Sequence, residues 1–187
     1  MKELSLNILD IAQNSVAARA KQIGISLVED PAGILTLTIT DDGKGMSPEM
    51  VSRVTDPFCT SRTTRKVGMG IPLLKLASEQ TGGVFSIRSV SVEQDPEQHG
   101  TVVTATFDTK SIDFTPLGDI VDTLITLIQG NPDIDYSFSH ITPRGEVSLD
   151  TRELRAVLGE VSLGEFEVLS WIRQSLEEEY AALKNES

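Results

Sequence analysis

Two stretches of alternating apolar and polar residues near the N-terminus constrain the fold more than any other feature. They are GISLVED and GILTLTIT, at residues 24–30 and 33–40, and the tetrapeptide DPAG joins them. Alternation with a period of two predicts β-strands with one buried face, and Asp, Pro and Gly are typical of turns. The sequence therefore predicts an antiparallel hairpin.

Helical patterns and a second hairpin surround the first one. Apolar spacing predicts helices over residues 2–21 and 71–81, and the Ser-Pro pair at 47–48 has the N-cap and first-position signature of a short helix. Residues 84–91 and 101–107 alternate like two more strands. This order predicts an α+β fold, a two-layer α/β sandwich with helices on one face of a mixed, mostly antiparallel sheet.

The chain becomes more acidic after residue 110. Residues 1–110 contain 11 Lys/Arg and 13 Asp/Glu, whereas residues 111–187 contain 5 and 15. The second part also has helix-like and strand-like segments, with capping-box spacing at Asp150–Glu153 and Ser162–Glu165. We expect two domains, 1–110 and a small acidic α/β appendage at 111–187.

Composition excludes several classes of protein. A net charge of −12 argues against binding of nucleic acid, which depends on Lys and Arg at the phosphates. No apolar run approaches the roughly 20 residues of a membrane span, and the first residues lack a secretory signal. Cys59 is the single cysteine, so no intrachain disulfide forms. We expect a cytoplasmic protein with no membrane contact.

Two glycine-rich stretches suggest a ligand site. At residues 41–46, DDGKGM combines a carboxylate with glycines that let the backbone approach a ligand. At residues 67–70, VGMG opens a predicted helix, whose free N–H groups and dipole attract anions. A simple turn and a flexible helix entry are the alternatives. Neither GxxxxGK[ST] nor GxGxxG occurs, so the usual nucleotide-binding loops are absent.

A polar pair, Asp10 and Asn14, lies on the first predicted helix within LDIAQNSVAA. Residues four apart share a helical face, so both side chains point the same way. In chain order, LDIAQNSVAA, ITDDGKGM, KVGMGIPLLKLASEQTGG and HGTVVTATF resemble the N box, the two glycine boxes and the final Gly-Thr strand of GHKL, or Bergerat-fold, ATPases. That family includes gyrase B subunits, mismatch-repair ATPases and histidine-kinase catalytic domains. The resemblance covers about residues 4–108.

The resemblance implies a site for ATP and Mg²⁺. Asn14 would coordinate Mg²⁺ that bridges the ATP phosphates, and Asp10 would stand where a glutamate often activates the attacking water. Asp41 would accept the adenine amino group. The other residues implied to bind the nucleotide are Gly43, Gly45, Met46, Arg62, Lys66, Gly68, Met69, Gly70, Ile71 and Thr101.

Three departures from the family pattern affect this interpretation. Asp10 is one methylene shorter than the usual glutamate, which predicts slow hydrolysis. Ala17 stands where several branches carry an acid, and Lys66 replaces a glycine. Lys66, with Arg62 and Arg65, either contacts the phosphates or forms a solvated basic loop.

The segment PFCTSRTTRKVGMGIPLL is similar in style to histidine-kinase catalytic domains, but we expect no phosphoacceptor histidine domain, because the N box begins almost at residue 1. His140 has the alternation of a core-facing strand residue, and His99 lies in a loop. The resemblance implies a protein that hydrolyses ATP or phosphorylates a separate partner protein in signal transduction. The alternative is a slow nucleotide-sensing switch in which residues 56–70 form a lid. The sequence leaves monomer or homodimer, and a redox role for Cys59, open.

Overall fold

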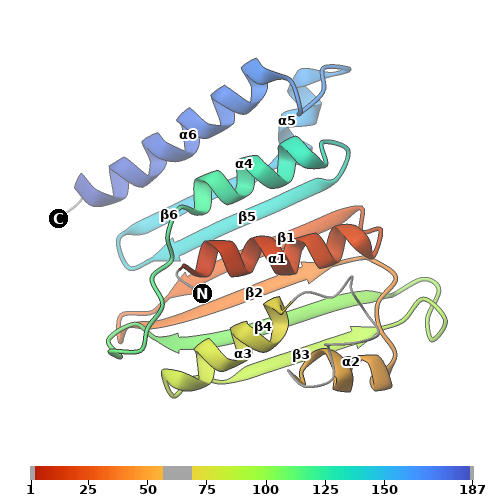
Figure 1. Ribbon diagram of the computed structural model, residues 1–187. Coiled ribbons are helices and arrows are strands. Elements are labelled where there is room, and N and C mark those ends of the chain that lie inside the picture. The colour runs from red at the N-terminus through yellow and green to blue at the C-terminus, as the bar shows by residue number, and fades with distance from the viewer. Residues whose placement is uncertain (1–2, 57–68, 186–187) are drawn as a thin grey trace.

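The computed structural model describes residues 3–56 and 69–185, which form six helices and six strands (Figure 1). The helices are α1 (Leu4–Ala17), α2 (Pro48–Val54), α3 (Gly70–Gln80), α4 (Ile120–Gly130), α5 (Thr151–Leu158) and α6 (Phe166–Asn185). The strands are β1 (Gln22–Glu29), β2 (Ile34–Asp41), β3 (Phe85–Val90), β4 (Gly100–Asp108), β5 (Asp135–Thr142) and β6 (Gly145–Asp150).

The strands form one sheet in the order β3-β4-β2-β1-β5-β6. Every neighbouring pair is antiparallel except β1 and β5, which run parallel with Ile23 opposite Tyr136. The sheet is therefore mixed and mostly antiparallel, and both predicted hairpins are confirmed as β1–β2 and β3–β4.

Helices α1, α3, α4 and α6 lie side by side over one face of this sheet (Figure 1). Alternate residues of each strand point toward them and form the core. The largest fully buried side chains are Tyr136, Phe107, Leu4, Ile8, Ile23, Leu27, Leu37, Ile39, Leu74, Leu124, Leu127 and Ile128. This arrangement confirms the predicted α+β fold with two layers.

Helix α1 is shorter than the predicted range of 2–21. It ends at Ala17 because Arg19 adopts a positive φ of 60°, a left-handed conformation that an α-helix does not continue. The Ala20 N–H then donates to the Ser15 carbonyl at 3.1 Å, which closes the helix end. The turn directs the chain straight into β1.

The opposite face of the sheet is polar. One cross-strand row contains a hydroxyl residue from every strand, in the order Ser86, Thr104, Thr38, Ser26, Ser139 and Ser148. An antiparallel sheet with one solvated face has this alternation of apolar and polar residues. The row explains why GILTLTIT places threonine at every second position.

The sheet continues across residue 110, because β5 adds to the free edge of β1. The segment before α4 also contacts the start of α1: the Leu4 and Ser5 N–H groups donate to the carbonyls of Pro116 and Leu117, each at 2.8 Å. The Thr123 hydroxyl donates to the Ser5 carbonyl at 3.0 Å. The two-domain division stays a prediction.

The C-terminal capping predictions have different outcomes. Asp150 is the N-cap of α5 and accepts a hydrogen bond from the Arg152 N–H at 3.0 Å. Ser162 does not cap a helix, because α6 begins only at Phe166. The Ser162 hydroxyl instead accepts from the Gly164 N–H within a turn. A capping-box spacing alone does not distinguish these two local structures.

His140 is buried in the core, as its alternation predicts, with 4% of its surface exposed. Its Nε2 lies 2.7 Å from Glu29 Oε1, and its Nδ1 lies 2.7 Å from the Tyr180 hydroxyl. The carboxylate is an acceptor, so Nε2 donates to Glu29, while Nδ1 hydrogen-bonds to the Tyr180 hydroxyl. The pair of contacts connects α6 to β1 and β5.

Candidate nucleotide-binding site

The polar pair on α1 lies on the helix surface, where it is accessible. Asp10 is exposed and Asn14 is half-buried, and neither side chain hydrogen-bonds to any residue in the described part of the chain. They are one turn apart, so both face the same flank of α1. A carboxylate and an amide without protein partners are available to an external ligand.

The N-terminal end of α3 lies next to Asp10. A Cβ atom placed on Gly70 would lie 3.1 Å from the Asp10 Cβ, which is tighter than most side-chain contacts. Glycine at this position therefore allows α3 to start close to Asp10. The helix begins without a side-chain cap, so its first N–H groups and its dipole favour an anion there.

Asp41, at the end of β2, is held by two hydrogen bonds. Its Oδ2 accepts from the Ser15 hydroxyl at 2.6 Å, and its Oδ1 accepts from the Gly43 N–H at 2.9 Å. Asp41 shares the strand face of the buried Ile39, so its carboxylate lies on the helix side of the sheet. Both contacts orient the carboxylate for which the family resemblance predicts a contact with the adenine amino group.

Thr101 lies opposite Asp41 on the neighbouring strand β4. Its hydroxyl is 2.7 Å from the Ser89 hydroxyl, and that hydroxyl accepts from the Met46 N–H at 2.8 Å. Asp41, Thr101 and Met46 are thus brought together at one end of the sheet. Ser89 connects the glycine loop to the final Gly-Thr strand.

The loop over residues 41–46 is held on both sides by backbone contacts. The Lys44 N–H donates to the Ala18 carbonyl at 2.9 Å, and the Lys44 carbonyl accepts from the Val92 N–H at 2.7 Å. His99 Nδ1 hydrogen-bonds to the Gly43 carbonyl. Gly45 has a φ of 69°, and a Cβ there would lie 1.9 Å from the Val90 carbonyl oxygen, so only glycine fits.

The remaining predicted contacts divide into two groups. Met69 is 45% exposed and directly precedes α3, whereas the Ile71 side chain is buried in the core. The predicted phosphate contacts Arg62, Lys66 and Gly68, with Arg65 and Cys59, lie outside the described residues.

Sequence reasoning missed several polar residues that support the site. Ser15 directly follows Asn14 in the sequence, and this adjacency was the only signal that Ser15 belongs to the site. Ser89 and His99 come from the second hairpin, and a linear motif does not show that they meet the loop at 41–46. Asn7 was missed because it lies among apolar residues of α1.

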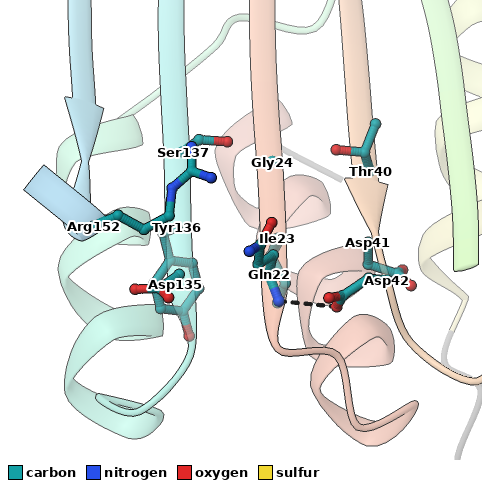
Figure 2. A pocket seen from close by; sticks show the side chains of 10 residues that line it. All are labelled: Gln22, Ile23, Gly24, Thr40, Asp41, Asp42, Asp135, Tyr136, Ser137 and Arg152. Atoms are coloured by element: carbon teal, nitrogen blue, oxygen red, sulfur yellow. Dashed lines mark hydrogen bonds between the residues drawn. The ribbon is translucent and has the colours of Figure 1, made fainter.

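A separate hollow of about 210 Å³ lies on the uncovered face of the sheet (Figure 2). Thr40, Gly24 and Ser137 occupy one cross-strand row there, and Asp42 accepts from the Gln22 N–H. The hollow exists because Gly24 has no side chain between two hydroxyl residues. Asp41 and Asp42, at the end of β2, are among the residues that line it, so the hollow borders the candidate site.

The described residues contain neither a cluster of metal-ligating side chains nor a membrane-spanning helix. No three His, Cys, Asp or Glu side chains among them gather where they could hold a metal ion. None of the described helices is both long enough and apolar enough to cross a bilayer.

Two curated relatives resemble part of the chain. A putative NtrY-like sensor histidine kinase of Rickettsia conorii is 24% identical over 116 residues, which are 60% of this chain and 18% of the relative. Sensor histidine kinase ZraS of Salmonella typhimurium is 27% identical over 85 residues, or 44% of this chain and 18% of the relative. The chain thus spans under a fifth of the length of these relatives.

Solved structures share the fold. The MutL ATPase domain of Aquifex aeolicus, complexed with ADP, superposes with a TM-score of 0.54 at 14% identity, covering 84% of this chain and 69% of that chain. The N-terminal domain of a DNA repair protein gives a TM-score of 0.51 at 18% identity, covering 80% and 52%. Both coverages extend beyond residue 111, so the shared fold includes part of the acidic segment.

The family model for histidine kinase-, DNA gyrase B- and HSP90-like ATPases matches residues 1–111. That range includes both glycine stretches, the polar pair on α1 and the Gly-Thr strand β4. Because the match covers more than half of the chain, the protein belongs to the family of histidine kinase-, DNA gyrase B- and HSP90-like ATPases.

Proposed function

We propose that this chain binds MgATP in the cytoplasm and either hydrolyses it or transfers its terminal phosphoryl group to a separate protein in signal transduction. The observation that carries the proposal is the proximity of Asp10 to the N-terminus of α3 at Gly70, with Asn14 one turn further along the same flank of α1. A carboxylate, an amide and a helix N-terminus in this arrangement suit a bound polyphosphate and a nearby water.

The other end of the site supports recognition of the base. Ser15 and Gly43 hold the Asp41 carboxylate by hydrogen bonds of 2.6 and 2.9 Å. An ionised carboxylate only accepts hydrogen bonds, so it would pair with an amino group such as that of adenine. Thr101 lies beside it in the sheet register and would support the same end of the nucleotide.

The residues present fit Mg²⁺ delivered with the nucleotide. Mg²⁺ takes one or two protein oxygens and keeps phosphate and water as its other ligands. Asn14 offers a half-buried amide that makes no hydrogen bond within the described residues. When bound, Mg²⁺ would neutralise charge on the phosphates, while Asp10 would accept a proton from the attacking water.

The test is phosphate release from γ-labelled MgATP by the wild type and by Asp10→Asn, with MgATP binding measured in both. We expect the variant to bind MgATP and to lose at least about 100-fold in kcat, the usual contribution of a general base. Gln13→Ala, an exposed position on the same helix, is the matched control and should behave as the wild type.

The outcomes separate the candidate functions. A wild type that does not bind MgATP at millimolar concentration would overturn the whole proposal. If both proteins bind and neither releases phosphate, the acceptor is a partner protein or the chain is a nucleotide-sensing switch. The shortened acid Asp10 favours the switch in that case, because its carboxylate would reach less far toward a bound phosphate than that of a glutamate.

A further inference from the structure

Asn7 is a buried polar residue in the apolar face of α1. Only 1% of its surface is exposed, and its neighbours Leu4, Ile8 and Ile11 belong to the core. Its Nδ2 donates a hydrogen bond of 2.7 Å to the Gly70 carbonyl, which is 63 positions away in the sequence. Its Oδ1 has no hydrogen-bond partner in the described parts of the chain.

This arrangement is not explained by folding stability. A buried carbonyl oxygen without a partner loses its hydrogen bonds to water and regains none, so Oδ1 makes the folded state less stable. The Gly70 carbonyl does not require the asparagine, because in an α-helix it accepts from the N–H four residues later. A leucine at this position would fill similar space without the unsatisfied oxygen.

The position of Asn7 relates it to the candidate site. Asn7 is three residues before Asp10, and residues three apart are neighbours on a helix surface. Gly70 lies next to both, since a Cβ on Gly70 would be 3.1 Å from the Asp10 Cβ. The Asn7 amide thus connects the phosphate-binding end of α3 to the helix that carries Asp10 and Asn14.

We infer that Asn7 is a positioning residue for ATP turnover, which sets the distance between Asp10 and the first turn of α3. The inference rests on the proposed function of this site. Asn7 acts through the Gly70 carbonyl and does not itself contact the nucleotide. Since a misplacement of about 1 Å can cost about 100-fold in rate, loss of this contact should lower kcat more than it weakens binding.

The first variant is Asn7→Leu, measured for thermal unfolding, MgATP affinity and kcat. We expect an unchanged or higher Tm, a kcat lowered at least about 10-fold, and affinity within about 3-fold of wild type. Ile8→Val is the matched control on α1: it should lower Tm slightly and leave kcat unchanged. Asn7→Leu with a lower Tm and a normal kcat would mean that Asn7 is only structural.

A second readout requires no nucleotide. Amide hydrogen exchange at Leu73 and Leu74 reports on the first turn of α3, where the Leu73 N–H donates to the Met69 carbonyl at 3.0 Å. Asn7→Leu should speed exchange there at least about tenfold while exchange in β1 and β2 stays the same. Unchanged exchange at both amides would overturn the inference even if the wild type turns over ATP. Failure of the wild type to bind MgATP would overturn the proposed function instead.

Discussion

The Ser15 hydroxyl donates to Asp41 across the interface between α1 and β2, with 2.6 Å between Ser15 Oγ and Asp41 Oδ2. The donor is one residue beyond Asn14, so one helix carries both the residue proposed to bind the metal and phosphates and a residue that orients the carboxylate proposed to recognise the base. The two ends of the candidate site are therefore connected through α1.

Removal of this hydroxyl should weaken nucleotide binding. In Ser15→Ala the Asp41 carboxylate keeps its contact with the Gly43 N–H but loses the bond from the helix. Hydrogen bonds to charged groups contribute about 1.5–3 kcal/mol, so we expect MgATP affinity at least about tenfold lower in calorimetric titration. Ser5→Ala removes another buried hydroxyl from α1 away from Asp41 and should leave affinity unchanged. Equal effects of both substitutions would contradict a specific role.

Gly45 should tolerate no side chain. In Gly45→Ala the new Cβ would lie 1.9 Å from the Val90 carbonyl oxygen, at a φ of 69°. We expect the free energy of unfolding, measured in urea, to fall by at least about 2 kcal/mol. Gly82→Ala is the control, because Gly82 also has a positive φ of 80° but nothing within 4 Å of the added Cβ. That variant should lose only about 1 kcal/mol.

Alkaline pH should destabilise the fold through Tyr136. Burial raises the pKa of Tyr136 to about 12, although the nearby Arg155 charge opposes this rise. Between the ordinary pKa near 10 and pH 12, the unfolded chain loses the phenol proton while the folded chain keeps it. The free energy of unfolding should therefore fall by up to about 1.4 kcal/mol per pH unit in this window.

Tyr136→Phe isolates this contribution from Tyr180, whose pKa is also raised by burial. The Tyr136 hydroxyl donates to the carbonyls of Leu127 and Asn131, so the variant should be about 1 kcal/mol less stable below pH 10. Its disadvantage should shrink as pH rises toward 12, measured by urea unfolding at each pH. A constant difference would show that Tyr136 ionises at its ordinary pKa when folded.

The predicted division at residue 110 can be tested with the fragment 1–110. In that fragment β1 would lose its parallel neighbour β5, and the start of α1 would lose the carbonyls of Pro116 and Leu117. An exposed strand edge promotes association, so we expect a less stable fragment that self-associates on gel filtration. A monomeric fragment with a cooperative thermal transition would support two independent domains.

Sequence periodicity predicted the helices and strands of this fold, but it did not predict every pairing between the strands. Alternation in residues 33–40 identifies the buried face of β2, and the glycine stretches identify the ends of the site. A period of two does not specify which strands pair, so the parallel pairing of β1 with β5 required the structure. Arg19, a non-glycine residue at positive φ, gave no signal that α1 would end early.

In the candidate site too, the sequence did not reveal which residues contact one another. Asp10, Asn14 and Asp41 belong to short linear motifs and could be proposed from the sequence. The residues that hold them come from distant segments: Ser15 is 26 positions from Asp41, and Asn7 is 63 positions from Gly70. Buried polar contacts of this kind depend on packing between elements, and a single sequence does not contain that information.

The parallel pairing of β1 with β5 also has a kinetic consequence. Ile23 of β1 pairs opposite Tyr136 of β5. The central strand β1 therefore cannot complete its pairing until β5, more than a hundred residues later in the sequence, has been synthesised. Pairings of such high contact order form slowly, because a long loop must close before any hydrogen bond compensates for the lost chain entropy. Completion of the sheet should therefore be the slow step of folding, and it follows synthesis of the acidic segment.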